Sequence, residues 1–157
     1  MLSLRAGRRR EEGFTLIELM VVVLILGILI AIALPMFLGA RTRAHDAAAG
    51  ADLRNALAAA KTYFAQSETY TSFDVAAALG EEPHLPWTGA VDPGATVNVA
   101  ILSAAGPQVL LVRRSIAGTY YCAYDDGSTS GLRRDDATPS VYANVDTVAD
   151  CGALPGI

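Results

Sequence analysis

The chain has 157 residues, with 12 basic and 16 acidic side chains and a net charge of −4 at pH 7. This length suits one domain with an anchor, and a mean hydropathy of +0.35 reflects one strongly apolar segment. The acidic balance repels phosphate backbones and argues against a nucleic-acid-binding protein.

The apolar segment runs from Phe14 to Leu34, and only Thr15, Glu18 and Gly27 interrupt it. As a helix it is about 30 Å long, which is enough to cross a bilayer, so we expect a transmembrane helix over residues 14–35. An arginine-rich tract (Arg5, Arg8, Arg9 and Arg10) precedes it. Because basic residues stay in the cytoplasm, the N-terminus is expected inside and the rest of the chain outside. A carboxylate in such a helix is costly, which marks Glu18 as functional.

The residues at this junction resemble a known motif. Glu12-Gly13-Phe14-Thr15-Leu16-Ile17-Glu18 is similar to the processing motif of type IV prepilins and of the pseudopilins of type II secretion systems. The resemblance implies that residues 1–13 are a leader, that a prepilin peptidase cuts between Gly13 and Phe14, and that Phe14 is then methylated. It also implies filament assembly, in which the new amino group of Phe14 meets the carboxylate of Glu18 on a neighbouring subunit.

Two simpler interpretations compete with this one. An ordinary secretory signal would be cleaved after Ala31-Ile32-Ala33, but its apolar region would exceed the usual length of about 7 to 15 residues. A plain signal anchor would explain the hydrophobicity. Neither one explains Glu18 or the Gly13-Phe14 junction.

Two helix breakers, Gly27 and Pro35, lie in and just after the membrane segment. They predict a hinge, although both residue types are also common in ordinary membrane helices. Over residues 36–66 apolar side chains recur at spacings of three and four, which predicts an amphipathic continuation of the same helix along a domain.

The remaining residues, 67–157, are expected to form a globular head. Residues 67–95 are rich in turn formers, with a short helix predicted over 73–79 and Trp87 filling the core. Strands are predicted over 96–102, 108–114 and 118–124, as an antiparallel meander with one face on the long helix. Residues 132–134 or 140–145 could add an edge strand. The predicted fold class is α+β, with a long N-terminal helix on a small antiparallel sheet, as in type IV pilins.

Two cysteines, Cys122 and Cys151, fall in the part expected outside the membrane, where an even count indicates one disulfide. It would close a C-terminal loop, a layout that pilins share. Within this loop the pairs Asp125-Asp126 and Asp135-Asp136 are possible calcium ligands, but they lack the alternation of an EF-hand and suit turns better. No cofactor is otherwise expected.

No catalytic motif is present in the sequence, so we expect a protein that is not an enzyme. The resemblance implies a structural subunit of a type IV pilus, serving adhesion, twitching motility or DNA capture. It also implies three kinds of partner, namely prepilin peptidase, copies of itself and other pilins, and the assembly machinery. The expected location is the cytoplasmic (inner) membrane, followed by a cell-surface filament.

Two other roles remain open at this point. One is a pseudopilin of a type II secretion system; the cysteine pair favours a pilin. The other is a minor pilin for DNA uptake, with Arg113, Arg114, Arg133 and Arg134 as phosphate contacts, and the net negative charge argues against it.

Overall fold

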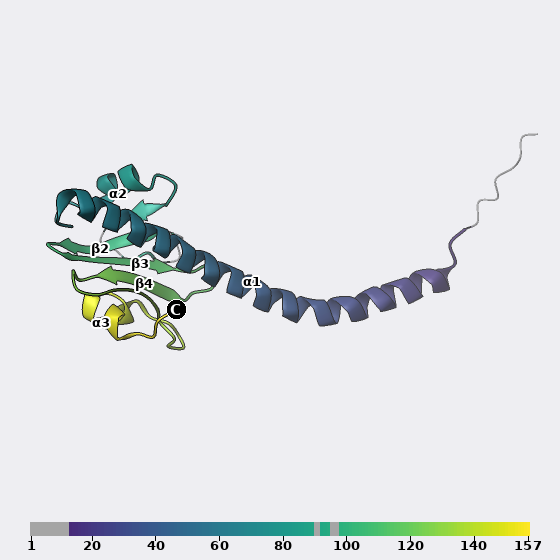
Figure 1. Cartoon of the computed structure of the whole chain (residues 1–157). Coiled ribbons are helices and arrows are strands. Elements are labelled where there is room, and N and C mark those ends of the chain that lie inside the picture. Colours follow the sequence, from purple (N-terminus) through teal and green to yellow (C-terminus); the bar gives the residue numbers. More distant parts are fainter. Residues whose placement is uncertain (1–12, 90–91, 95–97) are drawn as a thin grey trace, which may run out of the picture. The chain divides into compact units, whose positions relative to one another are not determined.

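The computed structural model describes residues 13–89, 92–94 and 98–157. The chain divides into two compact units, residues 1–39 and residues 40–157. We call the second unit the head. The helix α1 (Leu16–Ser67) supplies the described helical part of the first unit and enters the head, where it lies along the sheet (Figure 1).

The head contains the helices α2 (Val75–Glu81) and α3 (Val148–Ala153), a 3-10 turn (Tyr142–Asn144), and a five-stranded sheet. The strands are β1 (Trp87–Thr88), β2 (Val99–Ala105), β3 (Gln108–Arg114), β4 (Tyr120–Asp125) and β5 (Ser130–Arg134), in that spatial order. β2 to β5 form an antiparallel meander, and β1 adds in parallel to β2. The predicted α+β class and meander are therefore confirmed.

Alternating side chains of the sheet build two apolar clusters, one on each face. Val109, Leu111, Tyr121 and Ala123 pack with the buried residues of α1, including Leu53. The intervening residues face the other way, toward the C-terminal segment and α3 (Figure 1): Leu110, Val112, Tyr120, Cys122 and Tyr124 pack with Val145 and Cys151. Both faces are covered, which explains why five consecutive residues of β3 are buried.

Helix α1 presents small residues to the sheet. Ala49, Gly50, Ala56, Ala59 and Ala60 are all buried there. Short side chains allow the helix axis to approach the sheet closely, and Leu53 fills the remaining space. Polar contacts also join the two layers: Arg113 of β3 pairs with Asp52 of α1, and Lys61 of α1 donates to Ser130 of β5 at 2.6 Å.

Several predicted boundaries were wrong. The first strand lies at Val99–Ala105 rather than 96–102, and residues 95–97 are outside the described ones. The short helix occupies Val75–Glu81 because the Asp74 carboxylate accepts a hydrogen bond from the Ala77 amide and caps it. Residues 140–145 contain a 3-10 turn, and the edge strand is Ser130–Arg134.

The sequence analysis missed α3 and β1. Trp87 fills the core as predicted, but it does so from β1, with its indole N–H donating to the Glu82 carbonyl at 2.9 Å.

Candidate functional site

The junction between Gly13 and Phe14 lies in non-helical chain, one residue before the first helical turn. Gly13, Phe14 and Thr15 have no regular secondary structure, and all three are exposed. Apart from its chain neighbour Phe14, no atom of the described residues lies within 4 Å of the position that a Cβ on Gly13 would take. A peptide bond that is exposed and lies outside regular secondary structure is accessible to the active site of a peptidase.

Thr15 and Glu18 together cap the start of α1. The Thr15 amide and hydroxyl both donate to one Glu18 carboxylate oxygen, at 3.1 and 2.9 Å, and the Glu18 amide donates to the Thr15 hydroxyl at 3.3 Å. This reciprocal arrangement is a capping box, in which each residue satisfies a backbone N–H of the other. A carboxylate in the first turn also interacts favourably with the helix dipole.

Sequence analysis recognised Glu18 but missed its local partner. The signal was present, since Thr15-Leu16-Ile17-Glu18 fits the pattern of Ser/Thr followed three residues later by Glu or Gln. The capping box gives Glu18 hydrogen-bond donors within its own chain before any neighbouring amine arrives. An assembly contact at Glu18 would therefore compete with this cap or add to it.

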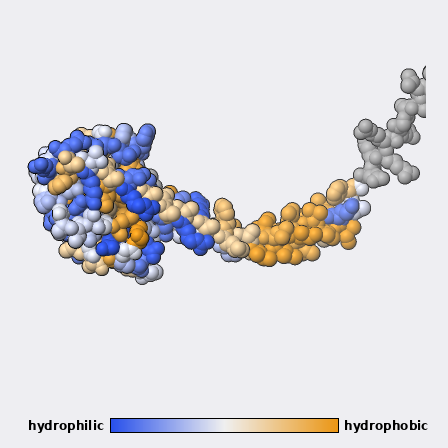
Figure 2. Space-filling view, in the orientation of Figure 1, coloured by the Kyte–Doolittle hydropathy of each residue, from blue (hydrophilic) through white to orange (hydrophobic). Residues whose placement is uncertain are grey.

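The N-terminal part of α1, up to Leu38, exposes its large apolar side chains. Large hydrophobic side chains from Phe14 to Leu38 are roughly half to four-fifths exposed, with Phe14 at 78% and Leu38 at 53%. Figure 2 shows this segment as a mainly hydrophobic surface with a small hydrophilic area near its N-terminal end, whereas the head presents a mixed one. By length and composition α1 could span a membrane. Surface of this kind requires lipid or other helices to cover it.

The two predicted hinge residues lie inside an unbroken helix. α1 continues through Gly27 and Pro35, and Gly27 has no neighbouring atom that would crowd a Cβ. The hinge therefore stays a prediction. It concerns the helix in an assembled filament, whereas the structure describes a single chain.

The predicted disulfide is confirmed. Cys122 of β4 and Cys151 of α3 are bonded, with Cα atoms 6.0 Å apart, and both are fully buried. The bond fastens the C-terminal segment to the sheet on the face opposite α1.

The four aspartates considered for calcium are held by protein groups and are dispersed. Asp125 accepts a hydrogen bond from Tyr70 and lies 3.6 Å from the Lys61 ammonium, whereas Asp126 caps the turn to Thr129. Asp136 pairs with Arg134. Within the described residues no group of three or more His, Cys, Asp or Glu side chains could hold a metal ion.

Asp135 is a structural residue. Only 2% of its surface is exposed, and its carboxylate accepts hydrogen bonds that organise the C-terminal loop. The donors are the Ala137 amide, the Ser140 hydroxyl, the Val141 amide and the Asn144 side chain. Burial by itself raises the pKa of Asp135, but these hydrogen bonds outweigh it and hold the pKa below its ordinary value.

The chain is similar in sequence to proteins of known families. Residues 8–34 match the prokaryotic N-terminal methylation motif. The chain is 33% identical over 115 residues to the type IV wide pilus major component PilA4 of Thermus thermophilus, a match that covers 73% of this chain and 82% of that protein. No solved structure matches the chain.

Two shorter matches are to a type IV pilin and to a type II secretion protein. The type IV major pilin protein PilA of Myxococcus xanthus is 44% identical over 64 residues, which cover 41% of this chain and 29% of that protein. Core protein G of the type II secretion system of Pseudomonas aeruginosa is 42% identical over 65 residues, 41% of this chain and 46% of that protein. The chain thus spans less than half the length of these two relatives. On the longer match and the motif, it belongs to the family of type IV pilins and type II secretion pseudopilins, which are structural proteins rather than enzymes.

Proposed function

We propose that a prepilin peptidase cuts this chain between Gly13 and Phe14 and methylates Phe14, and that the product is a structural subunit of a type IV pilus. The observation that carries the proposal is the match to a pilus major component over 115 residues, which extends well beyond the shared N-terminal helix into the head. The exposed junction and the uncovered apolar helix support it.

The cleavage product has chemistry suited to assembly. Removal of residues 1–13 deletes four arginines and two glutamates, so that 8 basic and 14 acidic side chains remain and the charge is about −6. It also leaves the α-amino group of Phe14 free, four residues from Glu18. In a bundle of such helices, an amine and a carboxylate on neighbouring subunits can compensate each other's desolvation, which fixes the axial register.

Mass spectrometry of the mature protein tests the processing step. The intact mass should correspond to a chain that begins at Phe14 and carries one additional methyl group. A chain that begins at Leu34, after the alternative small-residue site, would instead establish an ordinary signal peptide.

The variant Glu18→Ala tests assembly. It should reach the membrane at wild-type level, because loss of a carboxylate favours insertion, but its yield in sheared filaments should fall at least tenfold. Glu18→Asp is the matched control for charge, with a shorter reach to the neighbouring amine and an intermediate yield. A wild-type filament yield from Glu18→Ala would remove the assigned role.

A pseudopilin of a type II secretion system is the second candidate. The matches to core protein G favour it, since one of them is 42% identical over 65 residues. That match covers 41% of this chain, however, whereas the match to the pilus component covers 73%. Loss of surface filaments with intact protein secretion in a deletion strain would separate the pilus role from the secretion role.

A further inference from the structure

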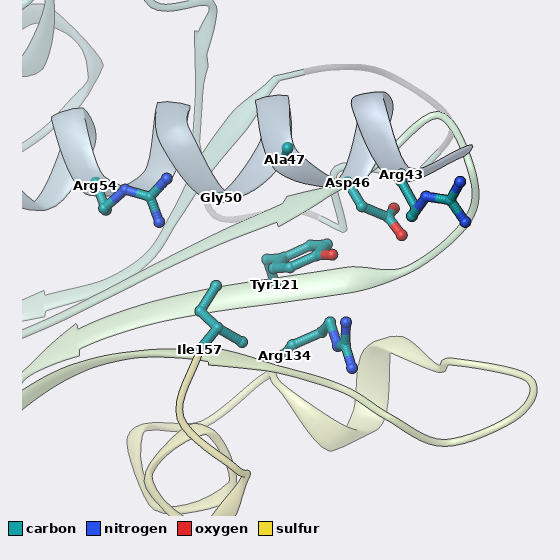
Figure 3. A pocket seen from close by; sticks show the side chains of 8 residues that line it. All are labelled: Arg43, Asp46, Ala47, Gly50, Arg54, Tyr121, Arg134 and Ile157. Atoms are coloured by element: carbon teal, nitrogen blue, oxygen red, sulfur yellow. The ribbon is translucent and has the colours of Figure 1, made fainter. Parts of the chain in front are cut away.

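An open cavity of about 250 Å³ lies in the head, between α1 and the sheet. Figure 3 shows Arg43 and Arg54 at its two ends on α1, with Tyr121 and Arg134 facing the helix from the strands. We call it the arginine cavity. The two α1 arginines are eleven residues apart, which is three turns, so they share one helix face.

Charge in the arginine cavity is only partly compensated. Asp46 is the one carboxylate side chain on its wall, and it already accepts a hydrogen bond from the Ser115 hydroxyl at 2.6 Å. Arg134 pairs with Asp136 at 2.5 Å. Within the described part of the chain, Arg43 and Arg54 form no ion pair or hydrogen bond. Two guanidinium groups are thus available to an incoming carboxylate, which they can bind bidentately.

The opposite end of the head carries the complementary charge. Glu68 follows the C-terminal end of α1, whereas Glu81 and Glu82 lie at the end of α2. Glu81 is tied to this end of α1 by the Gln66 side chain at 3.3 Å. None of the three glutamates forms an ion pair with another described residue. We call this group the acidic end.

The acidic end cannot reach the arginine cavity of its own head. The middle of the cavity wall, near Gly50, and Gln66 are sixteen residues apart on one helix, which corresponds to about 24 Å, and Arg54 is twelve residues, or about 18 Å, from Gln66. Both distances exceed the combined reach of an arginine and a glutamate side chain. The two charged groups can therefore meet only between two copies of the chain, one displaced along the helix axis by roughly this length.

We infer that the arginine cavity binds the acidic end of a second copy of this chain, with Arg43 and Arg54 receiving Glu81 and Glu82. The inference rests on the proposed function, because a filament supplies such axially displaced copies. The contact gives every head a directional axial interaction in addition to the one between N-terminal helices. Heads packed antiparallel would bring like charges together, which is unfavourable.

The test is a charge swap in the full chain, expressed in cells that assemble the wild type. The double variant Arg43→Glu/Arg54→Glu should reduce sheared filaments at least tenfold, with an unchanged membrane level of subunit. Glu81→Lys/Glu82→Lys should do the same. All four substitutions together should restore the yield to within about threefold of the wild type, because the attraction is re-established with the charges exchanged.

Matched controls isolate the cavity from general charge effects. Arg41→Glu makes the same change on α1 two residues away, outside the cavity lining, and Asp146→Lys reverses an exposed acid elsewhere on the head. Both should leave the yield unchanged. Filaments of the wild type should also dissociate more readily at 1 M than at 0.15 M salt, since the screening length falls from about 8 to about 3 Å.

Two results overturn the inference while leaving the proposed function intact. One is a wild-type yield from Arg43→Glu/Arg54→Glu. The other is a loss that the fourfold swap does not restore, which would assign the cavity to a different anion. Absence of filaments from the wild type itself would instead refute the proposed function.

Discussion

The disulfide between Cys122 and Cys151 should be a main source of the head's stability. The two cysteines are 29 residues apart in sequence. In the chain-entropy model, closing a loop of 29 residues lowers the entropy of the unfolded chain by ~12 cal/mol/K, which is ~3.6 kcal/mol at 25 °C. The segment enclosed by the bond contributes little burial of its own, with Val145 its only fully buried large apolar residue after β4.

The expected change in melting temperature follows from this free energy and the entropy of unfolding. For a head of about 118 residues the unfolding entropy is roughly 0.25 kcal/mol/K, so loss of the bond should lower the melting temperature by about 14 °C. Circular dichroism of the head with and without reductant measures it. The variant Cys122→Ala/Cys151→Ala should melt at least as low and should not respond to reductant, which controls for side effects of the reagent.

A fall of less than about 4 °C would refute the reasoning. It would show that the C-terminal segment is held by its apolar contacts with β3 and β4, or by the hydrogen bonds around Asp135, rather than by the crosslink. Loss of amide protection in α3 before the sheet, after reduction, is the corresponding local result.

Three further predictions concern separate parts of the chain. Residues 40–157 expressed alone should be soluble and melt cooperatively with a mixed helix and strand spectrum, because both apolar clusters lie within them; an aggregated or unfolded product would contradict this. Asp135→Asn should destabilise that head by about 1.5 to 3 kcal/mol at pH 7, since it removes hydrogen bonds to a charged group. Because the folded pKa of Asp135 lies below the unfolded one, its contribution is present above about pH 4 and is lost as the pH falls further, so acid titration of Asp135→Asn should be flatter in that range. Thr15→Ala should increase amide exchange in the first turn of α1 in detergent, whereas Thr15→Ser, which keeps the hydroxyl, should not.

The sequence by itself determined those features that depend on neighbouring residues along the chain. Hydrophobicity and charge around Phe14 predict a membrane segment and its direction, and β-branched residues with intervening turns place β3 at Gln108–Arg114. The end of α1 was predicted at residue 66 and lies at Ser67, since helical spacing persists up to that point. The disulfide followed from counting the cysteines of an exported segment.

Only the tertiary structure decided features that depend on residues brought together from a distance. β1 has two residues and exists because Trp87 and Thr88 find partners in β2, a contact that local propensity does not encode. The arginine cavity joins residues of α1 to Arg134 of β5, and its free charges became visible only once the paired ones were known. The role of Asp135 likewise required the folded loop. In the sequence it is one more turn aspartate, whereas in the structure it is buried among four donors and its hydrogen bonds organise residues 135–144.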